Sequence, residues 1–191
     1  MRSVWALAVV GLMLVAPIRP VDAQNGASIP IAAVWREQHL NFFYMGRTSR
    51  YSCEGLRDKV RAMLLDLGAR RDIRVTALGC DEAAARERPG SLGPSLNIVV
   101  FTPALPDASA KPLHPGDLAA VYARFEPFTI TSDAFRNMGI ADCELVEEFS
   151  RQILPKLAAR IVKQDITCVP LQQSGSRFLV RGEVLRTVVP H

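Results

Sequence analysis

The placement of the four cysteines constrains the fold of this chain more than any other feature of the sequence. Cys53 and Cys143 each open a segment with helical periodicity, and Cys80 and Cys168 each end the strand-like segment that follows. The same order of elements therefore occurs twice, and any fold must bring each later cysteine to a definite place relative to its helix. Four cysteines allow three pairings, and their number alone does not choose among them.

The lengths of the elements favour the pairs Cys53–Cys80 and Cys143–Cys168. The first helix advances about 24 Å at about 1.5 Å per residue, and the strand after it returns about 26 Å at about 3.3 Å per residue. In the second unit the helix advances about 28 Å and the strand returns about 23 Å. A strand antiparallel to its helix thus ends beside the helix N-terminus, where the first cysteine lies.

Reactive thiols at Cys53 or Cys143 are the main alternative to disulfides, because a helix N-terminus lowers the pKa of a cysteine. Against this alternative, the sequence has no C-x-x-C motif, and its three histidines do not accompany either thiol as an evident base. The cysteines also lack the close paired spacing of a zinc site. We therefore favour two structural disulfides, each stabilising the fold by about 3–4 kcal/mol.

The N-terminus has the organisation of a signal peptide. A short basic start, Met1-Arg2, precedes an apolar run of about 14 residues, which is shorter than the ~20 that span a membrane. Small or short side chains then flank Ala23, so we expect residues 1–23 to be removed there. An uncleaved anchor is the alternative. The predicted location is periplasmic or secreted, where disulfides persist, with no membrane span in the mature chain.

Residues 24–101 are expected to form a first strand–helix–strand–strand unit. Alternation predicts an opening strand with one apolar face, made by Leu40, Phe42 and Tyr44. Helical spacing follows in Leu56, Val60, Met63, Leu64 and Leu67. Ser52 is the predicted N-cap of this helix, and Gly68 the residue that ends it. Residues 72–79 alternate again, and residues 95–101 are typical of a buried strand.

Residues 102–117 carry four prolines and are expected to be a linker, followed by a second unit at residues 118–191. This unit begins with a strand at residues 119–131 and a helix whose start matches the first: Asp142-Cys143-Glu144 corresponds to Ser52-Cys53-Glu54. The expected stripe of this helix is Val146, Phe149, Ile153, Leu157 and Ile161. Pro155 should kink or break it. Strands at residues 164–169 and 177–186 end the chain.

Together these elements predict an α+β fold of two layers. Two pseudo-repeated strand–helix–strand–strand units would pack their helices on one face of a mainly antiparallel sheet. The repetition of the order of elements, and of the cap–Cys–Glu start of both helices, indicates a degenerate internal duplication.

The turn before the first helix is a candidate anion-binding site. Arg47, Thr48, Ser49 and Arg50 lie where backbone N–H groups and the helix dipole favour anions. No glycine-rich cradle accompanies them, so a solvated, capped turn is the alternative. The sequence carries no recognisable nucleophile, metal or dinucleotide motif, and we predict neither cofactor nor metal. A net charge of +4 spread along the chain does not indicate a nucleic-acid partner.

The segments YSCEGLRDKVRAMLLDLGARRDI and DCELVEEF resemble a group of uncharacterised exported proteins of Gram-negative bacteria. The resemblance covers most of the mature chain and implies a periplasmic or secreted location. It implies no activity, ligand or catalytic residue.

The function predicted from these features is that of an exported, disulfide-stabilised, non-enzymatic protein that binds or scaffolds a partner in the bacterial envelope. A thiol-dependent enzyme using Cys53 or Cys143 is one alternative. A small-ligand carrier is another, and it requires a pocket larger than about 300 Å³ between helices and sheet.

Overall fold

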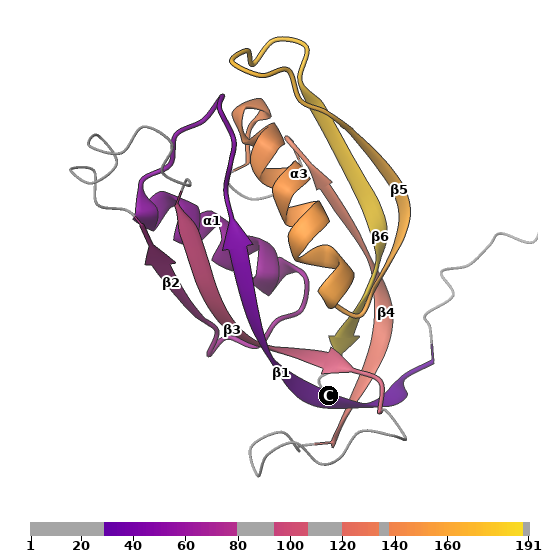
Figure 1. Ribbon diagram of the computed structural model, residues 1–191. Helices are drawn as coiled ribbons and strands as arrows, with labels where there is room; N and C mark the ends of the chain where they lie inside the picture. Colours follow the sequence, from indigo (N-terminus) through magenta and orange to yellow (C-terminus); the bar gives the residue numbers. More distant parts are fainter. Residues whose placement is uncertain (1–28, 80–93, 107–119, 134–137, 189–191) are drawn as a thin grey trace, which may run out of the picture.

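The computed structural model describes residues 29–79, 94–106, 120–133 and 138–188 (Figure 1). These residues form one antiparallel six-stranded sheet and two α-helices, which confirms the predicted α+β class. The strands are β1 (Ile31–Phe43), β2 (Arg74–Leu78), β3 (Ser95–Ala104), β4 (Ala120–Thr131), β5 (Ala159–Thr167) and β6 (Arg177–Thr187). The helical elements are α1 (Cys53–Asp66), α3 (Cys143–Gln152) and the short 3-10 turns η1 (Ile140–Asp142) and η2 (Leu154–Lys156). None of these helices has the length and apolar character needed to cross a membrane.

The strand order is β2-β3-β1-β4-β6-β5, so each half of the chain contributes three neighbouring strands. In each half the first strand pairs with the last, and the last pairs with the strand at the sheet edge. The halves meet where residues 31–34 of β1 pair with residues 120–123 of β4. Beyond this seam β1 keeps only its partner β3, and the two halves diverge, with α3 between them (Figure 1).

Local sequence signals set both ends of α1 as predicted. The Ser52 side chain accepts a hydrogen bond from the N–H of Gly55 at 3.1 Å, which caps the first turn. At the other end Gly68 has φ +90°, the left-handed conformation that glycine adopts without strain. The N–H groups of Gly68 and Ala69 each donate to a carbonyl of the last turn at 3.0 Å. This pattern is the Schellman motif.

Helix α3 ends earlier than the sequence pattern suggested. The predicted stripe ran to Ile161, but α3 ends at Gln152 and β5 already begins at Ala159. Pro155 lies at the start of the short turn η2, where its missing N–H removes no helical hydrogen bond. The break that Pro155 predicted is confirmed, whereas the helical assignment of Leu157 and Ile161 was wrong. Ile161 instead lies on the edge strand, with 43% of its surface exposed.

Strand β3 continues to Ala104, three residues into the expected linker of residues 102–117. Pro103 pairs there with Trp35 of β1. Strand β2 reaches only to Val99 of β3, so on its other side Pro103 has no partner among the described strands. A proline is tolerated at such an edge position because it need not donate to a ladder. Residues 107–117, the rest of the expected linker after Pro106, lie outside the described residues.

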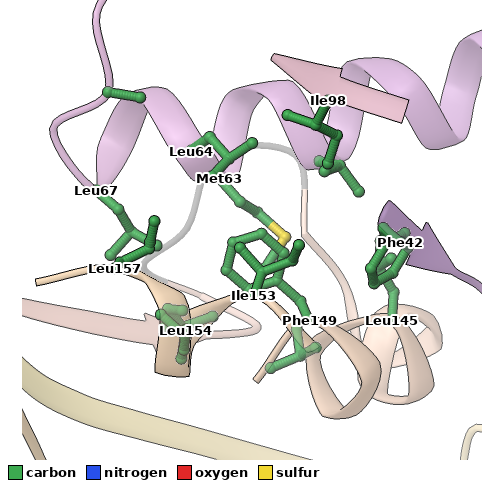
Figure 2. Packing of buried hydrophobic residues seen from close by; sticks show 14 of the residues in the cluster. Phe42, Met63, Leu64, Leu67, Ile98, Leu145, Phe149, Ile153, Leu154 and Leu157 are labelled. Carbon is green, nitrogen blue, oxygen red and sulfur yellow. The ribbon is translucent and has the colours of Figure 1, made fainter. Parts of the chain in front are cut away.

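One apolar core joins the two halves. It contains side chains of both helices and of strands from each half. In Figure 2, Met63 of α1 extends toward Phe149 of α3 and toward Ile153, the residue just after α3. All three are fully buried. Burial of each such side chain stabilises the fold by about 1.5–3 kcal/mol. A smaller cluster, Ala33, Ala123 and Leu185, lies at the seam.

Candidate functional site

Cys143 and Cys168 form a disulfide with a Cα–Cα distance of 5.6 Å, as predicted. The bond joins the first residue of α3 to the residue that follows β5, so the returning strand does end beside the helix N-terminus. Cys143 is only 3% exposed. Its sulfur is oxidised and buried, so in this state it is not available as a nucleophilic thiolate.

Cys53, the first residue of α1, is also disulfide-bonded. Its predicted partner, Cys80, lies outside the described residues. The specific pair Cys53–Cys80 therefore stays a prediction.

The predicted anion-binding turn contacts a carboxylate that the chain itself supplies. The backbone N–H groups of Arg47 and Thr48 each donate to Oε2 of Glu144 at 2.7 Å. The Ser49 hydroxyl donates to the carbonyl of Ala141 at 2.6 Å, whereas Arg50 is exposed. Backbone donors of this turn thus hold an internal carboxylate. Binding of an external anion at this turn stays a prediction, and it would have to compete with Glu144.

Asp142 lies beside this contact and is only 5% exposed. Its Oδ2 accepts from Lys59 Nζ at 2.8 Å and from the N–H of Gly139 at 2.7 Å, and its Oδ1 accepts from the hydroxyl of Tyr51. The matching start of the two helices predicts that Asp142 caps α3 as Ser52 caps α1. That expectation was wrong, because both carboxylate oxygens are occupied by these donors and make no cap hydrogen bond.

Two tyrosines complete this cluster. The rings of Tyr44 and Tyr51 meet edge to face with their centroids 5.0 Å apart. Burial raises the pKa of both hydroxyls above the usual value, assisted by the charge of Glu144 at Tyr44 and by the hydrogen bond to Asp142 at Tyr51. Both phenols therefore remain protonated donors at neutral pH.

We call Tyr44, Tyr51, Lys59, Asp142 and Glu144 the polar joint. Its carboxylates come from the second half of the chain, and their side-chain partners come from the first. Each carboxylate already accepts at least two hydrogen bonds inside the protein. Chemically, the arrangement serves to hold the two halves together.

A second feature is a hollow of about 480 Å³ between the first half of the chain and the segment of residues 156–158. We call it the seam hollow. Its lining includes Arg36, Gln38, Thr102, Leu105, Lys156 and Leu157. The amide of Gln38 donates to the hydroxyl of Thr102 at 2.7 Å, which fixes both polar groups in its wall. The hollow thus combines polar groups with apolar side chains, as ligand sites do.

The seam hollow is electropositive. Arg36 and Lys156 line it, and neither forms an ion pair with any residue that the structure describes. No acidic residue is among the lining residues. The two cations can therefore receive an anionic group from outside the protein.

Sequence reasoning did not find the seam hollow. Arg36 and Lys156 lie in opposite halves of the chain, and no local motif connects them. The only available signal was Lys156, which follows the helix-breaking Pro155 and thus marks a turn rather than a helix face. No protein-family model, no curated protein and no solved structure matches this chain.

Proposed function

We propose that this is an exported, disulfide-stabilised protein of the bacterial envelope that binds a small amphiphilic anion in the seam hollow without transforming it. The observation that carries this proposal is the presence of two cations without ion-pair partners in the described chain, in a hollow of about 480 Å³. The volume exceeds the ~300 Å³ expected of a small-ligand site. The oxidised Cys143–Cys168 pair supports a compartment in which disulfides persist.

The lining of the hollow specifies the chemistry of the ligand. Arg36 and Lys156 suit a carboxylate or phosphate group. Leu105 and Leu157 offer apolar surface beside them, which suits a short hydrocarbon body. The hydrogen-bonded Gln38–Thr102 pair presents further polar atoms for orienting the head group.

Calorimetric titration with octanoate tests this proposal, with 1-octanol as the uncharged match and inorganic phosphate as the head group alone. We expect octanoate to bind more tightly than either probe. The double variant Arg36→Gln, Lys156→Gln should weaken octanoate binding by about tenfold or more, because both charge-assisted contacts are lost. The control Arg177→Gln removes an exposed cation at the start of β6, where it faces Asp165 near the end of β5 that is remote from Ala158, and it should leave binding unchanged.

Two results would contradict the proposal. Equal binding of octanoate and octanol would mean that the cations do not recognise the ligand. An absence of octanoate and phosphate binding in the folded wild-type protein would remove the hollow as an anion site.

Non-reducing peptide mapping of protein purified from the periplasm tests the predicted location and the remaining disulfide. We expect no free thiol, a Cys53–Cys80 peptide, and a mature chain that begins after Ala23. A rapidly alkylated Cys53 would instead favour a thiol-dependent enzyme.

We also propose that the architecture arose by internal duplication, with both helices packed on one face of the sheet. Two observations support this proposal. The order of the three strands in one half is repeated in reverse in the other half. The sequence distance from Ile31 to Ala120 is also nearly the same as that from Cys53 to Cys143. If the two halves are related by two-fold symmetry, a linker from the end of β6 to the start of β1 should be tolerated in the same way as the linker that joins β3 to β4. A circular permutant that begins at residue 118 and links residue 188 to residue 29 should therefore unfold cooperatively, as the wild-type protein does. A permutant that lacks fixed tertiary structure by near-UV circular dichroism would contradict the symmetry.

A further inference from the structure

We infer that the outward face of β5 and β6 is a docking surface for a membrane that contains anionic phospholipids. Strand β5 stands at one end of the strand order, and β6 is its only partner among the described strands. Phe178, Val180 and Val184 of β6 belong to the core, so the residues between them point to the face away from the helices. Figure 1 shows both strands on the outside of the molecule, with α3 on their inner side. We call four outward-facing cations and one apolar side chain of these strands the basic edge: Arg160, Lys163, Arg177, Arg181 and Val162.

The register of the two strands places two cations side by side. Residues directly opposite one another in an antiparallel pair share a face of the sheet, and Lys163 lies opposite Arg181. Both are exposed, and neither forms an ion pair with any residue that the structure describes. Like charges in such a pair destabilise the sheet. An external anion that contacts both cations therefore relieves a repulsion that the fold leaves in place.

The other two cations of the basic edge are only loosely paired. Nε of Arg177 lies 3.7 Å from Oδ1 of Asp165, and Nη1 of Arg160 lies 4.0 Å from Oε2 of Glu183. Both distances exceed the roughly 2.7–2.9 Å of a close charge-assisted hydrogen bond. Cations therefore outnumber carboxylates on this face, and its charge is complementary to the phosphates of anionic lipids.

An exposed apolar side chain projects from the same strand. The register shifts between Ile161 and Lys163, so Val162 lies in a bulge without a partner in β6. Its surface is 77% exposed. An apolar side chain beside basic ones suits a bilayer interface, where the apolar group enters between the head groups while the cations contact phosphates.

The shape of the edge favours a membrane over a protein partner. Residues 160–164 are all exposed, so this stretch of β5 meets solvent on both of its faces. The bulge and Lys163 oppose pairing with a further strand. A folded partner needs a matching surface of about 800 Å², whereas a fluid bilayer adapts to a single projecting strand.

Vesicle sedimentation with protein purified from the periplasm tests this inference. Vesicles of phosphatidylglycerol and phosphatidylcholine in equal parts are compared with vesicles of phosphatidylcholine alone. We expect binding to the anionic vesicles and little binding to the neutral ones. Binding should weaken as salt is added, because salt screens exposed charges.

Variants with matched charge identify the surface. The double variant Lys163→Gln, Arg181→Gln should weaken binding to anionic vesicles by about tenfold or more. The control Arg71→Gln, Arg74→Gln removes the same charge from exposed residues at β2, the opposite end of the strand order, and should leave affinity unchanged. Val162→Ser keeps the charge and should weaken binding by about threefold, because less apolar surface enters the bilayer. Circular dichroism checks that each variant is folded.

Three outcomes would overturn the inference: no binding of the folded wild-type protein to anionic vesicles, an equal loss of affinity in the control variant, or binding to soluble poly-glutamate as tight as that to the vesicles. The last result would indicate an acidic protein as the partner. Neither Lys163 nor Arg181 lines the seam hollow, so their double variant should bind octanoate as the wild-type protein does. The two proposals therefore succeed or fail independently.

Discussion

The two helices begin with the same pattern, a polar residue followed by Cys and Glu, and the structure uses the pattern in two different ways. At α1, Ser52 and Glu54 are exposed, and Ser52 caps its own helix. At α3, Asp142 and Glu144 are 5% and 8% exposed, and their carboxylates bind groups from the other half of the chain.

The difference shows that burial, and not the local motif, decides what a helix start does. An exposed cap hydroxyl satisfies one N–H of its own helix. A buried carboxylate must instead be matched by several donors, because an unpaired buried charge is costly. In this protein most of those donors come from the turn and helix of the first half. The N-terminus of α3 is therefore part of the polar joint.

Replacement of Asp142 should cause the largest loss of stability. Asp142→Ala leaves the Lys59 ammonium, the Tyr51 hydroxyl and an N–H without their acceptor, and we expect a loss of about 3 kcal/mol in the free energy of unfolding. Ser52→Ala is the matched change at α1 and should cost about 1 kcal/mol. Urea unfolding of both variants measures the difference. Equal losses would mean that the two helix starts are energetically equivalent, contrary to the comparison.

Replacement of Glu144 should have the next largest effect. Glu144→Gln keeps the shape of the side chain but weakens the two 2.7 Å hydrogen bonds from the turn, so we expect a loss of about 1–2 kcal/mol. The matched variant Glu54→Gln removes an exposed charge near a helix N-terminus and should cost under about 1 kcal/mol. The salt dependence of stability provides a second measurement, because the exposed charge of Glu54 should be screened by salt more strongly. A larger effect at Glu54 would contradict the assignment.

This contrast also explains how much could be predicted from the sequence. The cap at Ser52 and the glycine that ends α1 follow from local spacing. The Cys143–Cys168 pair follows from the return of a strand beside its helix, although the helix is shorter than the length used to predict the pair. The roles of Asp142 and Glu144 depend on donors far away in the chain, which no local pattern reveals.

Two further features were decided by tertiary pairing. The positions around Ile161 fit a helical stripe, but a strand partner, β6, was available after the helix had been broken at Pro155. Arg36 and Lys156 line the seam hollow from opposite halves of the chain. Their common position depends on how the two halves diverge beyond the seam.

Two glycines that flank the helices allow a smaller test. Gly68, after α1, has φ +90°, and a Cβ there would lie 3.0 Å from Cγ of Arg186. We expect Gly68→Ala to destabilise the protein by about 1 kcal/mol because alanine disfavours this conformation. Gly139→Ala, before α3, is the control: φ is −125° and no atom lies within 4 Å of the added Cβ. Its effect should stay within about 0.5 kcal/mol. Thermal unfolding of both variants measures the difference, and a larger loss at Gly139 would contradict it.

The smallest expected effect is a pH dependence at the polar joint. The fold raises the pKa of Tyr51 above its unfolded value near 10, chiefly by burial and by the hydrogen bond to Asp142. The stabilising contribution is therefore complete below pH 10 and is lost as the pH rises above it, because only the unfolded chain releases the proton there.

Between pH 9 and 10.5 the loss should be below about 1 kcal/mol for this tyrosine. Urea unfolding across this range should give a shallower dependence in Tyr51→Phe than in the wild-type protein, because phenylalanine carries no proton to release. The variant loses the hydrogen bond to Asp142 at every pH, so the slope and not the absolute stability is the informative quantity. An unchanged slope would mean that Tyr51 ionises equally in both states. In that case the N-terminus of α3 would be as open to solvent as that of α1, and the contrast between the two helix starts would fail.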